Sequence, residues 1–283
     1  MSITKRTVLI TGCSNESGLG ANLAIAFHKA GLHVIATARN ASTMKKLAEQ
    51  GIETMALDVE SESSISTCVS QIPQLDILVN NAGAMYYMPV TDISIAQAKK
   101  IFDLNVWSHI AVTQAFIPLI VKSPRGMIVN QTSAASVTAI PFQSVYSASK
   151  AALAMLSATL RLELQPFGIA VVDLRTGGIN TGFLESTNKS KTPSLPESSI
   201  YQPVKEPVER VLRREGLQGF GPSPEKWAKD VVQDLLRKHP PPEIWRGELA
   251  WFAWFATKLP SGMFDGIIKK FSGMDVVEKA MQK

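Results

Sequence analysis

The sequence predicts an α/β fold in which helices cover both faces of a doubly wound parallel sheet. From the start to about residue 175, short apolar runs alternate with longer segments of helical periodicity, an order typical of βαβ units. The 283 residues suffice for one large domain of this class. Apolar residues make up 45% of the chain and charged residues 19%, a balance typical of a globular protein with a sizeable core.

The predicted strands are almost continuous in apolar residues, as expected for parallel strands that are buried on both faces. In chain order they are Thr7–Ile10, His33–Ala38, Thr54–Leu57, Ile77–Asn80, Met127–Asn130 and Ala170–Leu174. A short run after three consecutive prolines, Glu243–Trp245, is a candidate for the last strand.

The predicted helices lie between the strands and are recognised by apolar residues that recur every three or four positions. They are Leu19–Ala30, Ser42–Gln50, Ser63–Gln71, Ile95–Val121, Ser144–Gln165 and, later in the chain, Pro224–Lys238. Pro118 has no N–H to donate inside a helix, so we expect it to bend or end the fourth of these helices.

One domain is expected over residues 1–245, with a surface insertion at about 181–224. That insertion is rich in Ser, Thr, Pro and Glu and has little periodicity, which is typical of a long functional loop, here a lid with some helix. Residues 246–283 form a separate extension with an apolar run at Leu249–Ala256. This run is too short to cross a bilayer, which takes about 20 apolar residues.

The extension continues with apolar residues at helical spacing, flanked by lysines. These residues are Phe264, Ile267, Ile268 and Phe271. Four roles stay open at this stage: a helix packed on the protein itself, a pocket cover, a contact between subunits, or a helix lying at a membrane or lipid-droplet surface.

Composition and charge argue against several other classes of protein. The formal charge is +5, but Lys and Arg are spread along the chain and form no basic stripe, so we expect no nucleic-acid partner. Cys13 and Cys68 are too few for a disulfide framework, and no Cys or His pair has the spacing of a metal site. We therefore expect no metal and a reducing, cytoplasmic compartment.

A glycine-rich turn, TGCSNESGLG, follows the first predicted strand and opens the first helix. Glycine permits positive φ and lets the backbone approach a pyrophosphate, while the free N–H groups of the helix end face the anion. A glycine cluster alone is weak, but a strand before it and a helix after it complete the context of a dinucleotide site. The contacts expected here are Gly12, Ser14, Asn15, Gly18, Leu19 and Gly20.

The end of the second predicted strand favours NADPH over NADH. An acidic residue at this position would bind the adenosine ribose of NAD and repel the extra phosphate of NADP. The sequence there is ATARN, in which Arg39 follows Ala38 and no acid is present. A guanidinium suits bidentate binding of a phosphate. The alternative is an arginine that is merely solvated at a strand end.

Two further strand ends should border the same crevice, because ligands gather beyond the carboxyl ends of parallel strands. After the third strand, Asp58 and Val59 are placed to meet the adenine, although Asp58 could equally cap the next helix. The fourth strand leads into Asn80, Asn81, Ala82 and Gly83. These residues suit a close approach to a ribose and a bridge between strands, with a plain turn as the alternative.

A catalytic set is predicted from Ser133, Tyr146 and Lys150. Tyr146 and Lys150 are four residues apart, so on a helix both side chains lie on one face. A neighbouring ammonium favours the phenolate and lowers the phenol pKa from about 10, which makes Tyr146 a usable proton donor. The hydroxyl of Ser133 could hydrogen-bond a carbonyl oxygen and stabilise a developing alkoxide. A Tyr-x-x-x-Lys pair alone is common on helix surfaces, so the order of all these motifs carries the prediction.

Other reactive side chains are expected to have ordinary roles. His28, His33, His109 and His239 are scattered over helices and a strand edge, where packing or exposure is the usual outcome. Cys13 stands near a helix start that could stabilise a thiolate, but filling the glycine turn is the favoured role.

Over residues 7–182 the chain resembles the short-chain dehydrogenase/reductase family, which has a Rossmann-like fold. The matching motifs are TGCSNESGLG, NNAG, Asn105 in LNVWS, Ser133 and YSASK. The resemblance implies that Asn105 holds a helix kink and a water of a proton relay next to the cofactor, and that Ser133 positions the substrate carbonyl. It implies that Tyr146 is the acid, and that Lys150 binds the nicotinamide ribose and tunes Tyr146. Hydride would pass from C4 of the nicotinamide to the carbonyl carbon.

The resemblance also places Gly178, Ile179 and Thr181 around the nicotinamide amide, and it implies a homodimer or homotetramer formed through the two long helices. Two departures stand out. Five residues separate Gly12 from Gly18, more than the family's usual turn has, and Thr176 replaces the proline of a Pro-Gly segment. In detail the chain is similar to the acyl-dihydroxyacetone-phosphate reductase branch and to fungal reductases of secondary metabolism.

We therefore predict an NADPH-dependent reductase of a ketone or aldehyde. Two alternatives stay open: non-redox cyclisation, elimination or isomerisation on the same scaffold, and a membrane-surface protein that acts through its extension. Substrate specificity should lie in Met85–Met88, in 134–142 and in the insertion. The apolar residues of these segments suggest a hydrophobic small molecule.

Overall fold

The computed structural model describes residues 5–181, 194–213, 215, 219–260 and 262–282. Within them, seven parallel strands form one sheet in the order β3-β2-β1-β4-β5-β6-β7. The order reverses between β1 and β4, where open sheets of this kind bind ligands. The strands are β1 (Thr7–Ile10), β2 (His33–Ala38), β3 (Glu53–Ala56), β4 (Ile77–Asn80), β5 (Met127–Ser133), β6 (Ala170–Thr176) and β7 (Glu243–Arg246).

Helices connect the strands and continue beyond the sheet. Those within the sheet's connections are α1 (Leu19–Lys29), α2 (Lys45–Glu49), α3 (Glu62–Ser70), α4 (Ile95–Phe102), α5 (Ser108–Ile120), α6 (Ser144–Leu164), α8 (Lys205–Leu212) and α9 (Pro224–Leu235). The extension contributes α10 (Ala250–Ala256), α11 (Asp265–Phe271) and α12 (Met274–Met281). The predicted helix at Ser42–Gln50 begins as a 3₁₀ turn, η1 (Ala41–Met44), before it becomes α2.

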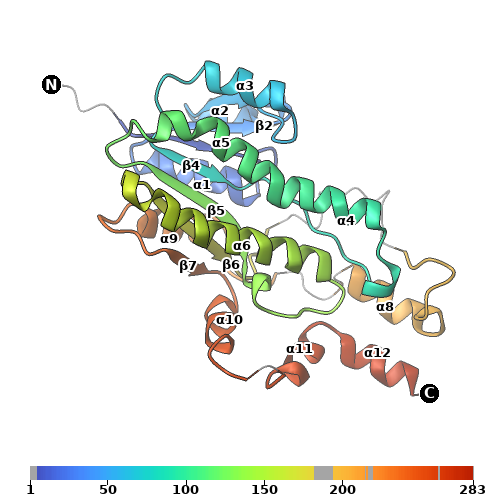
Figure 1. Ribbon diagram of the computed structural model, residues 1–283. Coiled ribbons are helices and arrows are strands. Elements are labelled where there is room, and N and C mark those ends of the chain that lie inside the picture. Colours follow the sequence, from blue (N-terminus) through green and yellow to red (C-terminus); the bar gives the residue numbers. More distant parts are fainter. Residues whose placement is uncertain (1–4, 182–193, 214, 216–218, 261, 283) are drawn as a thin grey trace.

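The sheet is buried on both faces, which confirms the predicted doubly wound fold. Figure 1 shows α4, α5 and α6 in front of the sheet with α1 and α9 behind it. One core contains Phe27 of α1 and Trp227 of α9, and the other contains Ile65 of α3 and Phe116 of α5. Successive strand residues alternate between the two cores, which explains why the strands are apolar throughout.

The prediction of one continuous helix over 95–121 is wrong in its middle. A turn of π-helix, η3 (Asp103–Trp107), separates α4 from α5. The interruption lies at Asn105, whose buried side chain both accepts a hydrogen bond from Ala84 and donates one to it, outside the helix. Pro118 lies inside α5, and that helix ends only after Ile120. A π-turn inserts an extra residue into a helix, so apolar periodicity does not reveal it.

The central strands are longer than predicted. β5 continues to Ser133 and β6 to Thr176, while β3 begins and ends one residue earlier than expected. All of the added residues are polar, and all but Arg175 are buried. Two of them on β5 bond across to β6: Gln131 to Thr176 and Thr132 to Asp173. The predicted strands therefore stop too early, because the prediction followed the run of apolar residues and these strands end in polar ones.

The insertion and the extension pack against each other. Part of the predicted lid, including 182–193, lies outside the described residues, but the rest contains α8 as expected. Val277 of α12 is buried in a cluster with Val208 and Leu212 of α8 and with Phe142. Of the roles left open for the extension, packing on the protein itself is therefore confirmed for α12. α10 is different, since Trp251 and Trp254 on it are exposed.

Candidate active site

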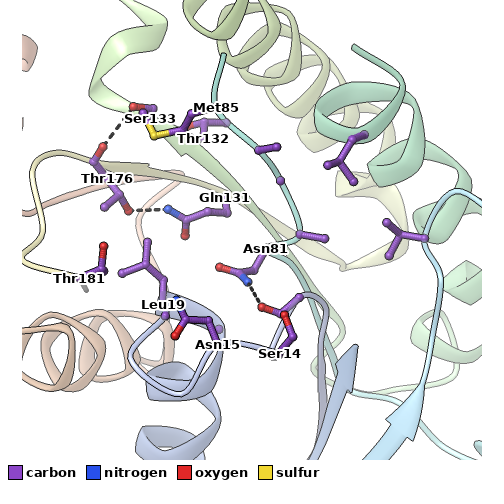
Figure 2. A pocket seen from close by; sticks show the side chains of 18 of the residues that line it. Ser14, Asn15, Leu19, Asn81, Met85, Gln131, Thr132, Ser133, Thr176 and Thr181 are labelled. Atoms are coloured by element: carbon purple, nitrogen blue, oxygen red, sulfur yellow. Dashed lines mark hydrogen bonds between the residues drawn. The ribbon is translucent and has the colours of Figure 1, made fainter. Parts of the chain in front are cut away.

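A cavity of about 370 Å³ opens beyond the carboxyl ends of the strands at the reversal between β1 and β4. It is lined by nearly every residue that the sequence assigned to the cofactor or to catalysis, with Asn105 behind its wall as the exception. Figure 2 shows this cavity with Asn81 and Leu19 on one side and Gln131, Ser133 and Thr176 on the other. The predicted site residues are: Gly12, Ser14, Asn15, Gly18, Leu19, Gly20, Arg39, Asp58, Val59, Asn81, Ala82, Gly83, Ser133, Tyr146, Lys150, Gly178, Ile179 and Thr181.

The glycine turn and the end of β4 are locked together. Thr11 Oγ1 accepts hydrogen bonds from the backbone N–H groups of Asn81 and Ala82, both at 2.9 Å, and Asn81 Nδ2 donates to Thr11 O at 2.7 Å. A Cβ on Gly12, whose φ is +75°, would lie 2.8 Å from Ala82 Cα. The turn therefore requires glycine at this position.

The long Gly12–Gly18 segment forms its own compact turn. Asn15 Oδ1 accepts hydrogen bonds from both the backbone N–H and the hydroxyl of Ser17, and Gly18 N–H donates to Asn15 O at 2.9 Å. Asn15 Nδ2 is buried without a partner. An unpaired donor beside free helix-terminal N–H groups suits a phosphate anion, so the residues present fit a dinucleotide despite the longer turn.

The adenosine end of the cavity carries one arginine. Arg39 lines it, and within the described part of the chain no carboxylate lies within 4.0 Å of its guanidinium. Asp58 Oδ1 accepts from Glu60 N–H at 3.1 Å, while Ser61 is the residue that caps α3. Asp58 thus shapes a turn and also lines the cavity. Glu60 lines the cavity too, and the sequence interpretation did not include it.

Lys150 is buried below the catalytic face of the cavity. Its Nζ donates to the backbone oxygen of Gln131 at 2.8 Å and lies 6.0 Å from the centre of the Tyr146 ring. Burial lowers the pKa of Lys150 to about 8, an effect that Asp173 partly opposes. Ser133 Oγ donates to Thr176 O at 3.3 Å and accepts from Ala135 N–H at 3.1 Å. Ser133, Tyr146 and Lys150 therefore border one cavity, as the sequence predicts.

Asn105 is fully buried behind the cavity and joins three segments. Its Oδ1 accepts from Ala84 N–H at 2.9 Å, and its Nδ2 donates to Ala84 O at 2.9 Å and to Ser149 Oγ at 3.0 Å. The π-turn η3 aims this side chain away from its own helix. A π-turn thus interrupts the helix at Asn105, while the relay water that the resemblance implied stays a prediction.

The bridging role predicted for the end of β4 is also present. Asn80 Nδ2 donates to Asn130 Oδ1 of β5 at 2.9 Å and to Thr113 Oγ1 of α5 at 3.0 Å. The amide therefore ties two neighbouring strands and a covering helix together below the cavity.

His109 supports the loop after β4, a role that the sequence did not indicate. It is buried, its Nε2 lies 2.7 Å from Ala82 O, and burial, with a further contribution from the Lys150 charge, lowers its pKa to about 3. A neutral ring that donates to Ala82 therefore supports the loop after β4. The prediction for Cys13 is confirmed: it is buried, and burial raises its thiol pKa to about 12.

The segment after β6 is pinned from outside the cavity. Gly177 N–H donates to Arg246 O, and Gly178 pairs with Glu248 through two backbone hydrogen bonds. A Cβ on Gly177 would lie 2.2 Å from Glu248 O. The first residues of the extension therefore fix the wall formed by Gly178 and Ile179. No sequence signal links residue 248 to this wall.

None of the described helices is long and apolar enough to span a membrane. The described residues also contain no cluster of three or more His, Cys, Asp or Glu side chains that could hold a metal ion.

Comparison with known proteins gives likenesses over the whole chain. A family model described as short chain dehydrogenase matches residues 6–192. A short-chain dehydrogenase/reductase of Pestalotiopsis microspora is 48% identical over 283 residues, covering 100% of this chain and 99% of that one. The NADPH-dependent 1-acyldihydroxyacetone phosphate reductase of Schizosaccharomyces pombe is 39% identical over 207 residues, covering 71% of this chain and 69% of that one.

Among solved structures, a short-chain dehydrogenase from Streptomyces avermitilis aligns over 98% of both chains, with a TM-score of 0.76 and 26% identity.

Proposed function

Because the chain belongs to the short-chain dehydrogenase family, as its motifs predicted, we propose that it is an NADPH-dependent oxidoreductase that interconverts a carbonyl and a secondary or primary alcohol. The observation that carries this proposal is the meeting of Ser133, Tyr146 and Lys150 in a cavity that also includes the glycine turn and Arg39. When bound, the dinucleotide supplies the hydride.

In this proposal Tyr146 gives its phenolic proton to the carbonyl oxygen as the alkoxide develops, and takes a proton in the reverse direction. Lys150 binds the ribose hydroxyls next to the nicotinamide, and its charge stabilises the phenolate. Ser133 donates a hydrogen bond to the same carbonyl oxygen and orients it. Asn105 is a positioning residue, because its contacts are with Ala84 and Ser149 of the site's supporting structure.

We assign the cofactor as NADPH because of Arg39. Its guanidinium has no carboxylate partner among the described residues, and it lines the end of the cavity nearest β2. The fission-yeast relative is named for its dependence on NADPH, which supports the same choice. The glycine turn, Asp58 with Val59, the loop after β4 and the segment 178–181 complete the proposed binding site.

The substrate is proposed to be a hydrophobic small molecule. Phe142 packs edge-on against Tyr201, with ring centres 5.9 Å apart, and Tyr87 and Met88 pack on the same cluster. Met88 N–H donates to Phe142 O at 2.9 Å, which joins the two segments expected to contact substrate. Met85, next to them in the chain, lines the cavity. An apolar molecule would therefore meet an apolar wall beside the catalytic groups.

The proposed organisation is one catalytic unit over 1–245 in the cytoplasm, with 246–283 closing its substrate side. Buried free cysteines suit a reducing compartment. We further propose that two copies pair through α5 and α6, since Met155 and Leu162 are exposed on α6.

The test is an assay of purified protein with NADPH and a panel of aliphatic, aromatic and polycyclic ketones and aldehydes. The measured signal is the loss of NADPH absorbance. The reverse reaction is assayed with NADP⁺ and the matching alcohols. Tyr146→Phe should lower turnover by about 10²- to 10⁴-fold and leave the NADPH dissociation constant within about twofold.

Two results would contradict the proposal. Protein that binds NADPH but never oxidises it with any carbonyl, and never reduces NADP⁺ with any alcohol, would not be a reductase. A product formed with no net change in NADPH would instead indicate the non-redox cyclisation, elimination or isomerisation that the sequence left open.

A further inference from the structure

A pair of polar side chains, Gln131 and Thr176, lies buried at the ends of β5 and β6. Gln131 is 5% exposed and Thr176 is 6% exposed. Gln131 Nε2 donates to Thr176 Oγ1 at 2.6 Å. The two residues lie on adjacent strands near the cavity's catalytic face, and both line the cavity.

The other polar atom of the Gln131 head group has no partner. Gln131 Oε1 is buried and accepts no hydrogen bond from the described residues. A buried acceptor without a donor destabilises a protein by about 1–3 kcal/mol, so such groups are rare and call for an explanation. A donor on a bound molecule is one such explanation.

The position of Gln131 narrows the identity of that donor. Residues two apart on a strand point to the same face, so Gln131 lies one step deeper than Ser133. Its backbone oxygen accepts the Lys150 ammonium. Figure 2 shows the Gln131 head group beside Thr176 and reaching into the space that Leu19 and Asn81 border on its far side. If the proposed function holds, this space takes the nicotinamide end of the dinucleotide.

The nicotinamide end of the cofactor carries one amino donor, the NH₂ of its carboxamide. Two main-chain acceptors nearby are already engaged: Gly178 O accepts from Glu248 N–H and Ile179 O accepts from Thr181 N–H, both at 2.8 Å. Gln131 Oε1 is the buried side-chain acceptor of the described cavity that lacks a donor.

We propose that Gln131 is a cofactor-binding residue whose Oε1 accepts a hydrogen bond from the nicotinamide carboxamide, and that Thr176 positions it. This inference rests on the proposed function. It also gives a physical role to the departure at Thr176, because a proline there would offer no hydroxyl to hold the Gln131 amide.

The experiment compares the binding of NADP⁺ with that of its 3-acetylpyridine analogue, in which a methyl group replaces the carboxamide NH₂. Dissociation constants come from calorimetry or from quenching of tryptophan fluorescence, so no turnover is needed. The natural protein should bind NADP⁺ about 10-fold more tightly than the analogue, because the analogue leaves Oε1 without a donor. Gln131→Met should bind the two with equal affinity.

Two variants on Thr176 test the positioning. Thr176→Val removes the hydroxyl and should lose most of the preference for NADP⁺, whereas Thr176→Ser keeps the hydroxyl and should retain it. Gln97→Met is the matched control, since Gln97 is exposed on α4 and makes no side-chain contact with the cavity. It should discriminate between the two molecules as the natural protein does.

Thermal unfolding without cofactor separates this role from a structural one. A residue kept for binding leaves an unsatisfied acceptor in the free protein, so the double variant Gln131→Met/Thr176→Val, which leaves neither partner of this hydrogen bond unpaired, should melt at or above the temperature of the natural protein. A residue kept for packing or for holding β5 to β6 would lower the melting temperature when replaced.

The outcomes are distinct. If the natural protein does not prefer NADP⁺ over the analogue, or if Gln131→Met keeps the preference, the inference is wrong while the proposed reductase stands. If the natural protein binds neither molecule, the proposed function itself fails.

Discussion

Asn105 Nδ2 and Ser149 Oγ are joined by a 3.0 Å hydrogen bond in the interior of the protein. Asn105 is in the π-turn η3, and Ser149 stands directly before Lys150 on α6. Ser149 Oγ also donates to the backbone oxygen of Tyr146 at 2.7 Å. This contact therefore fixes the helix that carries Tyr146 and Lys150 against the helix interruption and the loop after β4.

Asn105→Ala should destabilise the protein more than Ser149→Ala does. The first change leaves the half-buried Ala84 N–H and Ala84 O without partners, and a fully buried group of this kind costs about 1–3 kcal/mol, whereas the second change removes one hydroxyl. Urea unfolding of both single variants and the double variant measures this. We expect a coupling energy of about 0.5–3 kcal/mol. Strictly additive effects would show that the two residues do not act together.

Arg39→Glu should reverse the preference between NADPH and NADH. The guanidinium would lose its contact with the extra phosphate, and the carboxylate would repel it, so NADPH affinity should fall by about 10- to 100-fold. Fluorescence titration with each nucleotide measures the ratio. Lys29→Ala, an exposed change of charge at the far end of α1, is the control. An unchanged ratio in the Arg39 variant would mean that this arginine is only solvated.

Affinity for NADPH should fall as pH rises through about 8. Burial lowers the pKa of Lys150 to about 8, so above that pH the ammonium loses the proton that it would donate to the ribose. Titrations between about pH 6.5 and 9.5 bracket this value. Lys150→Met should bind weakly at every pH. If the NADPH affinity of Lys150→Met still falls near pH 8, the group that titrates there is not Lys150.

His109 should make the protein less stable in acid. Its pKa is lowered to about 3 in the folded protein, against about 6.5 in the unfolded chain. Between these values the unfolded chain binds more protons, so stability is complete above pH 6.5 and is lost as pH falls toward 3. The free energy of unfolding in urea should drop by about 2 kcal/mol between pH 7 and pH 5 from this group.

His109→Gln keeps an N–H for Ala82 O but does not titrate, so it should lose this part of the pH dependence. The exposed His239→Gln should keep it. Equal slopes for the two variants would contradict the assignment to His109.

Val277→Asp should release α12 and loosen the substrate side of the protein. Val277 is 1% exposed within the cluster of Val208, Leu212 and Phe142, whereas its neighbour Val276 is 52% exposed. A buried, unpaired carboxylate is strongly unfavourable, so the variant should lose amide-exchange protection in α12 and raise KM without changing NADPH affinity. Val276→Asp is the matched control, and identical behaviour of the two would show that α12 does not support this wall.

Most of the fold could be predicted because each strand of the sheet leaves a local signal. Thr7–Ile10 and Ile77–Asn80 are buried on both faces, and their boundaries agree with the apolar runs. The site followed from the same logic, since residues placed at strand ends are brought to one edge by any parallel sheet. Tyr146 and Lys150 could be paired because helical spacing is fixed.

The remaining features depend on contacts between distant residues. The π-turn at Asn105 is stabilised by Ala84 and Ser149, neither of which is near it in sequence. The strand extension from Gln131 to Ser133 pairs with Leu174 to Thr176 in the next strand. The pinning of Gly178 by Glu248 joins the cavity to a segment that the apolar pattern had set apart. No local pattern of residues encodes such pairs.

The cavity draws on the carboxyl ends of strands β1 to β6, from Gly12 to Thr181. It therefore exists only when the whole sheet has assembled, and a nucleotide held there binds the native chain but not the denatured one. At a hundred times its dissociation constant, such a ligand adds about 2.7 kcal/mol to the folding equilibrium. Nucleotide bound at that ratio would thereby lower the population of unfolded chain that a protease can cut.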